Sequence, residues 1–195
     1  MGAAVNTEDD PDVELMLAVQ RGDRSAFERL FEKHIASVIG FATRFVGTRA
    51  RAEELAQDVF LQVYKNRGRY EPRARFSTWL YRMVTNACLS EVRRADYRGH
   101  KQSMDQPGED GEDPPQVASA RSSEDDVVSH EILERMRGAL DELPPQQRAA
   151  VLLARIEGFS YEEVSESLSC SVSAVKSLIH RATVTLRDRL KEDCV

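Results

Sequence analysis

The sequence of 195 residues lacks features that mark whole classes of protein. No apolar run approaches the roughly 18 residues that a membrane-spanning helix needs. The N-terminal segment, from Met1 to Pro11, is acidic, whereas a signal peptide begins with a basic stretch followed by an apolar one. We therefore expect no membrane insertion and a cytoplasmic location.

Cysteine is scarce as well, since Cys88, Cys170 and Cys194 are the only three and lie far apart in the sequence. The four histidines are scattered, so no group of side chains has the close spacing of a zinc site. There is also no glycine-rich phosphate loop and no Ser/His/Asp set in a catalytic context. We therefore expect no cofactor, no metal ion and no enzymatic activity.

Period-two alternation is missing from residues 12–98, so we expect no β-sheet there. Apolar residues recur instead every three to four positions, which is typical of amphipathic helices. The pattern is interrupted at residues 21–23, 46–48 and 66–68. These interruptions predict three helices, and a fourth is expected from near Phe76 to the pair Arg93 and Arg94.

The composition changes after residue 98. Residues 99–131 contain nine acidic and two basic side chains, with several glycines and prolines, and such a segment cannot build a packed core. From about Ser129 the helical pattern resumes, stops before Pro144 and Pro145, and restarts at Gln146 through Ile156.

These observations predict an all-α protein with two small helical domains joined by a flexible acidic linker. The predicted boundaries are an acidic N-terminal segment at 1–11, to which we assign no role, a first domain at 12–98, the linker at 99–129 and a second domain at 130–195. The net charge of −6 conceals this division, because residues 12–98 carry 16 basic and 11 acidic side chains.

Residues 157–182 are the most informative segment and predict a helix-turn-helix. Ser160 stands directly before a helical run with Glu163 three residues later, which is the spacing of a capping box. Ser169 and Cys170 fill the turn, and Ser171 can cap the second helix. Apolar residues at helical spacing should turn one face of that helix to the core: Val175, Leu178, Ile179, Ala182 and Leu186.

The opposite face of the second helix presents polar and cationic side chains suited to base edges and phosphates in a major groove. They are Ser173, Lys176, Ser177, His180 and Arg181. Residues 171–191 hold five basic residues against Asp188 alone, so the local charge is positive. A plain amphipathic hairpin with a solvated basic face would show the same periodicity, so this segment alone does not decide.

A second candidate site lies around the expected start of the fourth helix. Trp79, Arg82, Asn86 and Ser90 fall within a few turns of one another, next to a turn over residues 68–75 that is rich in arginine. Bases that leave a duplex stack on aromatic rings while arginines hold the backbone. These residues therefore suit single-stranded or melting DNA, although core aromatics beside a solvated basic face would give the same pattern.

Four sequence motifs lie in the two predicted domains. They are Gln20-Arg21-Gly22-Asp23 with Ala26-Phe27, residues 52–60 (AEELAQDVF), residues 76–82 (FSTWLYR) and the segment 140–181. In these motifs the chain resembles the extracytoplasmic-function sigma factors of bacterial RNA polymerase, which keep only a promoter-melting domain and a helix-turn-helix domain. The resemblance covers about residues 12–98 and 130–191.

The resemblance implies a transcription initiation factor that binds core RNA polymerase, recognises two promoter elements and melts the duplex. It assigns recognition of the minus-35 element to Ser173, Lys176, Ser177, His180 and Arg181. Recognition and melting of the minus-10 element involve Tyr70, Arg73, Arg75, Trp79, Arg82, Asn86 and Ser90. Contact with core polymerase is assigned to Glu53, Asp58, Val59 and Gln62.

The partners that the resemblance implies are promoter DNA, an anti-sigma factor and core polymerase, through the clamp helices of the β′ subunit and the flap of the β subunit. Tyr70 stands where the family often has phenylalanine, and Ser90 and His180 occupy variable base-reading positions, so no promoter sequence transfers. A decoy that binds only an anti-sigma factor is the alternative. Such a protein could lose its basic reading face, whereas Lys176 and Arg181 are retained here.

Overall fold

The computed structural model describes residues 10–105 and 134–192. Within these ranges all regular structure is helical, as predicted, and no described helix is long and apolar enough to cross a membrane. The N-terminal region (residues 10–105) contains α1 (Pro11–Gln20), α2 (Arg24–Val46), α3 (Arg49–Lys65), the short 3-10 helix η1 (Arg67–Arg69) and α4 (Phe76–Asp105). The C-terminal region (residues 134–192) contains a helix over 134–141, α6 (Pro145–Val151), the π-helix η2 (Leu152–Ile156), α7 (Tyr161–Leu168) and α8 (Val172–Glu192).

The helix boundaries of the N-terminal region follow local signals. The Asp23 carboxylate accepts hydrogen bonds from the backbone N–H groups of Ser25 and Ala26 at 2.9 and 3.2 Å and so caps α2. Gly47 ends α2 with φ of 81°, a left-handed conformation that glycine adopts without a Cβ clash. Helix α4 begins at Phe76 as predicted but continues to Asp105, past its predicted end at Arg93 and Arg94, because no proline interrupts it before Pro107.

Helices α1, α2, α3 and α4 pack around an aromatic core. Phe41 and Phe45 on α2 are fully buried and stack at 6.0 Å between ring centroids. Phe76, which opens α4, is also fully buried, and its backbone N–H donates to the carboxylate of Asp10. Burying one such phenylalanine contributes about 1.5 to 3 kcal/mol.

The C-terminal region packs its short helices against α8. Leu152 and Leu153 of the π-helix and Val164 of α7 are buried together with Val175 of α8. Helix α6 starts at Pro145, one residue before the predicted start at Gln146, because proline needs no N–H partner at the first helical position. The predicted helical run to Ile156 is present, with its last turn widened to a π-helix.

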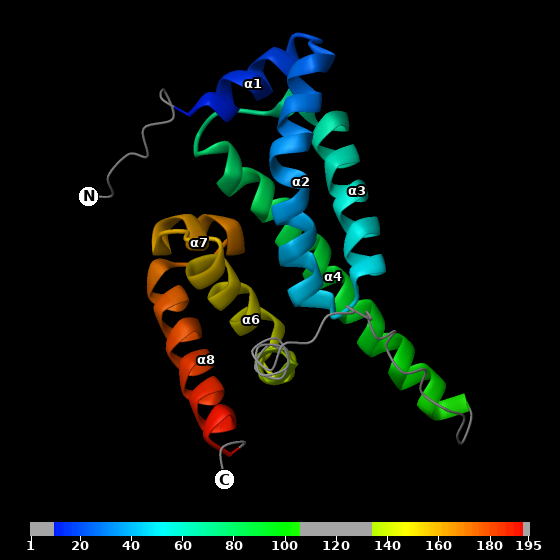
Figure 1. Cartoon of the computed structure of the whole chain (residues 1–195), viewed down its shortest axis with the longest axis vertical. Coiled ribbons are helices and arrows are strands. Elements are labelled where there is room, and N and C mark those ends of the chain that lie inside the picture. Colours follow the sequence, from blue (N-terminus) through cyan, green and yellow to red (C-terminus); the bar gives the residue numbers. More distant parts are fainter. Residues whose placement is uncertain (1–9, 106–133, 193–195) are drawn as a thin grey trace, which may run out of the picture.

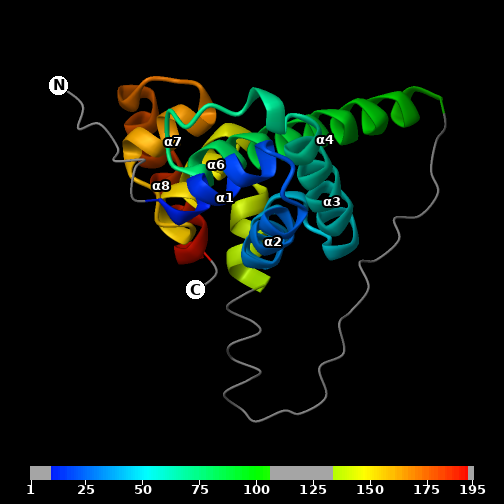
Figure 2. The same ribbon diagram turned by 90° about the horizontal axis from the view of Figure 1, so that it is seen from above.

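The two regions share one hydrophobic core, which the sequence did not indicate. Helices α4 and α7 lie against each other, and α6, α7 and α8 form one side of the molecule in both ribbon views (Figures 1 and 2). The Tyr81 ring of α4 packs edge-on against Phe159 at 5.1 Å between centroids. The guanidinium of Arg148 on α6 donates to the backbone oxygen of Phe45 at 2.7 Å. Residues 106–133, which include most of the predicted linker, lie outside the described residues.

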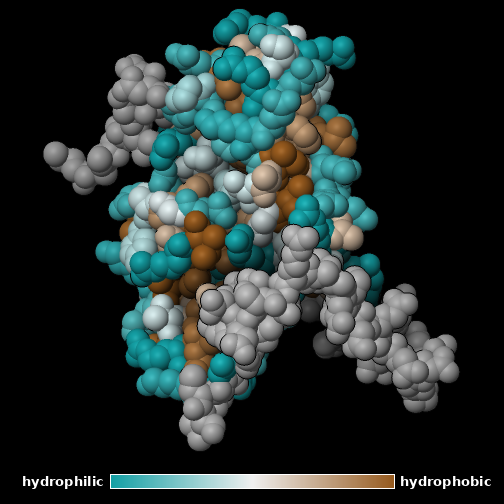
Figure 3. Space-filling model, viewed as in Figure 1, coloured by the Kyte–Doolittle hydropathy of each residue, from teal (hydrophilic) through white to brown (hydrophobic). Residues whose placement is uncertain are grey.

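The surface is mostly hydrophilic, with hydrophobic patches on the face shown in Figure 3. Among the described residues, the large hydrophobic side chains that remain exposed include Leu61 on α3 and Tyr97 on α4. The C-terminal turns of α4 project past α3 in both ribbon views (Figures 1 and 2). Tyr97 and Arg98, near this end of α4, are both exposed.

Candidate nucleic-acid interface

The helix-turn-helix is built by α7, a tight turn and α8. The Ser160 hydroxyl accepts from the Glu163 N–H at 3.2 Å, and the Glu163 carboxylate accepts from the Ser160 N–H at 2.9 Å, so the predicted capping box is confirmed. Ser169 turns the chain with φ of 53°, which is unusual for a residue other than glycine. The Ser171 hydroxyl then accepts from the Ala174 N–H at 3.2 Å at the start of α8.

Helix α8 has the two faces that its sequence predicted. Val175, Ile179 and Ala182 are buried in the core. The five residues assigned to the minus-35 element are all exposed and lie together on the opposite face: Ser173, Lys176, Ser177, His180 and Arg181. None of these five is needed to hold the core, so they are available to contact DNA.

The loop before α4 brings a second group of candidate residues together. Arg73, Trp79 and Arg82 line one pocket of about 430 Å³, and Arg69 and Glu71 complete that side. The Trp79 indole is half-buried, and the centroid of its ring lies 5.0 Å from that of Tyr70 in an edge-to-face contact. The exposed part of the indole and the two arginines form a surface that suits a stacked base and its phosphates.

Tyr70 differs from its neighbours because its side chain is buried, with only 3% of the residue exposed. Burial raises the pKa of its phenol, and the hydroxyl has no hydrogen-bond partner. The ring also packs on Phe76. In this conformation Tyr70 therefore supports Trp79 from beneath and does not present its own face.

The other minus-10 candidates lie outside this pocket. Arg75 is exposed, and its guanidinium lies 3.6 Å from the Glu163 carboxylate of α7. Asn86 and Ser90 are exposed on the next turns of α4 and continue the line that Arg82 begins, since they follow it at intervals of four residues. The structure thus divides the predicted group into a pocket and a stripe along α4.

Helix α7 covers part of this surface, which sequence reasoning did not anticipate. Glu166 and Ser169 of the helix-turn-helix line the same pocket as Trp79 and Arg82. The Ser167 hydroxyl donates to the backbone oxygen of Thr78 at 3.4 Å. The Tyr81 hydroxyl donates to the Glu157 carboxylate at 2.5 Å, and burial, followed by this bond, raises the pKa of the phenol. Acidic groups of one candidate site therefore face basic groups of the other.

The residues assigned to polymerase contact lie on α3. Asp58 and Gln62 are exposed, and Glu53 is half-buried and accepts from Arg49 at 2.8 Å. Val59 has only 3% of its surface exposed and belongs to the core, so it cannot contact a partner directly. Leu61 is 55% exposed between Asp58 and Gln62, although nothing in its sequence spacing singled it out.

Comparisons with known proteins agree with this architecture. Residues 30–98 match the family described as "Sigma-70 region 2", and residues 133–186 match "Sigma-70, region 4". The chain is 34% identical over 171 residues to RNA polymerase sigma factor CarQ of Myxococcus xanthus, covering 88% of this chain and 92% of that protein. It is 30% identical over 178 residues to ECF RNA polymerase sigma factor SigW of Bacillus subtilis, covering 89% and 94%.

A solved structure shares the fold. The sigma factor RpoE of Bartonella quintana, crystallised with the anti-sigma factor NepR, superimposes with a TM-score of 0.64 and 23% identity, covering 85% of this chain and 96% of that chain. The match extends over both helical regions, so the packing of helices described above has a counterpart among known proteins.

Proposed function

The chain belongs to the ECF RNA polymerase sigma factors, which are transcription initiation factors that recognise promoter elements. On this basis we propose which surface of the chain binds each promoter element and which surface binds core polymerase. The observation that carries the proposal is the pair of exposed polar surfaces. One surface is the outer face of α8, and the other runs from the loop before α4 along α4. We take the predicted domain boundaries with one change, which is that the first domain extends to the end of α4 at Asp105.

The face of α8 reads the minus-35 element in the major groove. The side chains of Lys176 and Arg181 supply charge, while Ser173, Ser177 and His180 supply hydrogen-bonding groups to base edges. Because these five residues lie on one exposed face, the helix can enter the groove without disturbing the core formed by Val175 and Ile179. A decoy would not need this exposed basic face.

The surface at the start of α4 captures the opened minus-10 strand. A flipped base stacks on Trp79, and Arg73 and Arg82 hold the neighbouring phosphates. Asn86 and Ser90 continue the contact along α4, where amide and hydroxyl groups can read exposed base edges. Tyr70 sets the position of the indole.

Promoter recognition requires the two regions to separate. The two elements lie about 25 base pairs apart, which is about 85 Å of duplex at 3.4 Å per step. In this structure Ser169 lines the same pocket as Trp79 and Arg82 of the minus-10 surface. Ser173, the first residue of the minus-35 surface, follows Ser169 by four residues, so the Cα atoms of these two serines are at most about 14 Å apart. The closed arrangement therefore cannot place both reading surfaces on one promoter.

The exposed side of α3 contacts core polymerase through Asp58 and Gln62, with Leu61 as an apolar contact between them and Glu53 at its edge. Such a surface suits the clamp helices of β′, and the C-terminal region would meet the flap of β. An anti-sigma factor is the further partner, as in the complex of the Bartonella protein with NepR. The protein works without catalysis of its own, in the cytoplasm.

The test is run-off transcription by core RNA polymerase on fragmented DNA of the source genome, with and without this protein, followed by sequencing of the transcript starts. The proposal predicts new starts that share two upstream elements separated by a constant spacer. Core binding without new starts would contradict the assignment of DNA recognition. Absence of both core binding and new starts would favour the decoy.

A further inference from the structure

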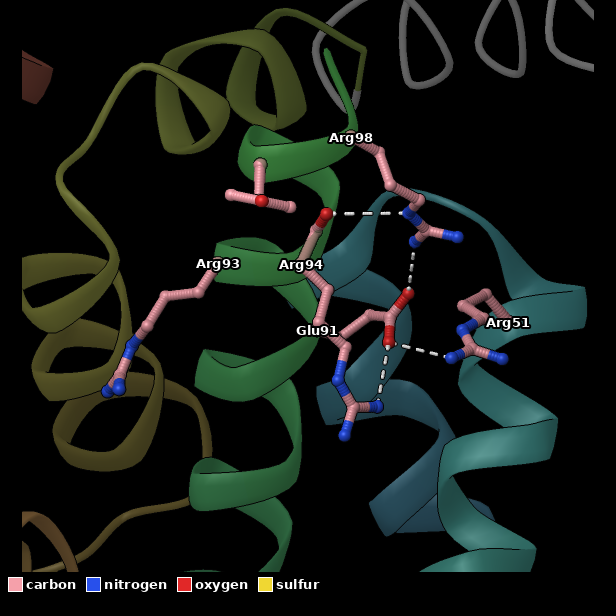
Figure 4. Close-up of a pocket in the computed structure, with 6 residues that line it drawn as sticks. Arg51, Glu91, Arg93, Arg94 and Arg98 are labelled. Carbon is pink, nitrogen blue, oxygen red and sulfur yellow. Dashed lines mark hydrogen bonds and ion pairs between the residues drawn. The ribbon is translucent and has the colours of Figure 1, made fainter. Parts of the chain in front are cut away.

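A cluster of arginines surrounds a buried carboxylate where α3 meets the C-terminal half of α4 (Figure 4). Arg51 of α3 donates to the Glu91 carboxylate at 2.6 Å, and Arg98 donates to its other oxygen at 3.0 Å. The Arg94 guanidinium lies 3.9 Å from the same carboxylate. Together with Arg93 and Tyr97 these residues line a pocket of about 420 Å³.

The arginines of this cluster outnumber the carboxylates that pair with them. The Glu91 side chain is only 7% exposed, and the hydrogen bond from Arg51 is the main cause that holds its pKa below the usual range, so it contributes one negative charge. Arg51 also pairs with Glu54. Three arginines pair with these two carboxylates, namely Arg51, Arg94 and Arg98, and the side chains of Arg94 and Arg98 are 72% and 67% exposed.

Stabilisation of the helix itself does not account for these arginines. Cations favour the last turn of a helix because of its dipole, but the effect falls off within that turn. Helix α4 continues to Asp105, so Arg94 and Arg98 lie before its last turn. Arg51 already links α3 to α4 through Glu91. Arg94 and Arg98 also face Glu91, but their side chains are mostly exposed, and each guanidinium has further N–H groups that can bind an anion.

The cluster continues the surface proposed to hold the opened strand. Arg82, Asn86, Ser90, Arg93 and Tyr97 follow one another at intervals of three or four residues, and all are exposed. They therefore form one stripe along α4, and Arg94 and Arg98 flank its C-terminal end. At 1.5 Å per residue, the distance from Arg82 to Arg98 is about 24 Å, or about seven base pairs of duplex.

We propose that Arg94 and Arg98, held with Arg51 around Glu91, bind backbone phosphates of the duplex DNA that borders the opened minus-10 element on its upstream side. The proposal rests on the assignment of the minus-10 surface to the start of α4. The opened region extends from this element downstream to the start of transcription, so the only duplex next to the element lies upstream. Each planar guanidinium can grip a phosphate with two parallel hydrogen bonds.

The experiment uses holoenzyme reconstituted from core polymerase and this protein, with forked DNA taken from a promoter that the run-off assay identifies. Both forks carry the minus-10 element as single strand. The short fork ends at its upstream edge, and the long fork adds ten base pairs of duplex, which do not reach the minus-35 element. Affinity is measured by fluorescence anisotropy between 50 and 200 mM salt.

Two bound phosphates should steepen the dependence of log affinity on log salt by about 1.8 for the long fork relative to the short one. Over a fourfold rise in salt this amounts to about 12-fold of extra weakening. The double variant Arg94→Gln/Arg98→Gln should lose this difference while binding the short fork as before. The variant Arg94→Lys/Arg98→Lys should keep the slope, because its charge is retained.

Arg24→Gln/Arg29→Gln is the matched control, because it removes two exposed charges from α2. Thermal unfolding of each variant shows whether it is folded. The proposal is overturned if Arg94→Gln/Arg98→Gln keeps the difference in salt dependence between the two forks, or if the control variant loses it too. A third fork carries an unpaired strand in place of the ten upstream base pairs, and an equally steep salt dependence with this fork would also overturn the proposal. A separate measurement tests the minus-10 assignment itself. If a folded Trp79→Ala variant binds the short fork normally, the assignment of the minus-10 surface to the start of α4 is wrong.

Discussion

Removing one hydroxyl group at the contact between the two regions should release the minus-10 surface. The Tyr81 hydroxyl donates to the Glu157 carboxylate, and the Tyr81 ring also packs on Phe41 and Phe159. Tyr81→Phe keeps both ring contacts and deletes only the hydrogen bond between the regions. The perturbation is therefore confined to the closed arrangement.

The size of the effect follows from the environment of Glu157. A hydrogen bond to a charged group contributes about 1.5 to 3 kcal/mol, and the lower figure applies because Glu157 is half-buried and water can solvate the released carboxylate. A change of about 1.5 kcal/mol shifts the ratio of closed to open protein about tenfold. The apparent affinity of a ligand that binds only the open form rises by the same factor while the closed form dominates.

The assay is binding of a fluorescent single strand carrying the minus-10 element to the protein without polymerase. We expect Tyr81→Phe and Glu157→Gln to bind about tenfold more tightly than the unmodified protein. Tyr64→Phe is the control, because that ring packs on Phe27, far from Glu157 in the fold. If both interface variants bind no more tightly than the control, the closed arrangement does not restrict the minus-10 surface and our reasoning is wrong.

Further outcomes concern the two reading surfaces and the interface. Lys176→Ala and Arg181→Ala should each weaken minus-35 recognition by about 1 to 3 kcal/mol if the contact is to a base, and uniformly across sequences if it is to a phosphate, which binding to mutated elements distinguishes. Trp79→Ala should leave binding to the minus-35 duplex intact and impair opening, as seen by permanganate reactivity of unpaired thymines; normal reactivity in a folded variant would make the ring purely structural. Ser160→Ala should lower stability by about 1 kcal/mol in thermal unfolding, because it removes the cap of α7. Because burial and Glu157 raise the pKa of Tyr81 in the closed form, the contribution of this phenol to stability should be fully present below about pH 10 and be lost at up to about 1.4 kcal/mol per unit above it. Denaturant unfolding between pH 9 and 11 measures this fall, and Tyr81→Phe should make it shallower.

The elements that the sequence predicted well are those set by neighbouring residues. The breaks at Gly22 and Gly47 and the capping box of Ser160 and Glu163 depend on residues only a few positions apart. The same holds for the two faces of α8, since a spacing of three to four residues places Lys176 and Arg181 opposite Val175. Local geometry therefore determines most of the helix boundaries and the exposed face of α8.

The features that escaped prediction depend on residues far apart in the sequence. Tyr81 meets Glu157, and Arg148 meets the backbone of Phe45, across most of the chain, and no periodicity signals such pairs. The burial of Tyr70 likewise depends on how its ring packs against the rings of Phe76 and Trp79. A motif can name a residue type, but only the packed structure shows which side chains remain exposed.

The core shared by the two regions keeps apolar side chains away from water while the protein is not bound to polymerase. Separation exposes Tyr81, Phe159 and their apolar neighbours to water, which favours aggregation and cleavage by proteases. The closed form covers these side chains and places Glu166 of α7 in the pocket that Trp79 and Arg82 line. The closed form therefore protects the chain from aggregation and proteolysis until a partner replaces the lost contacts.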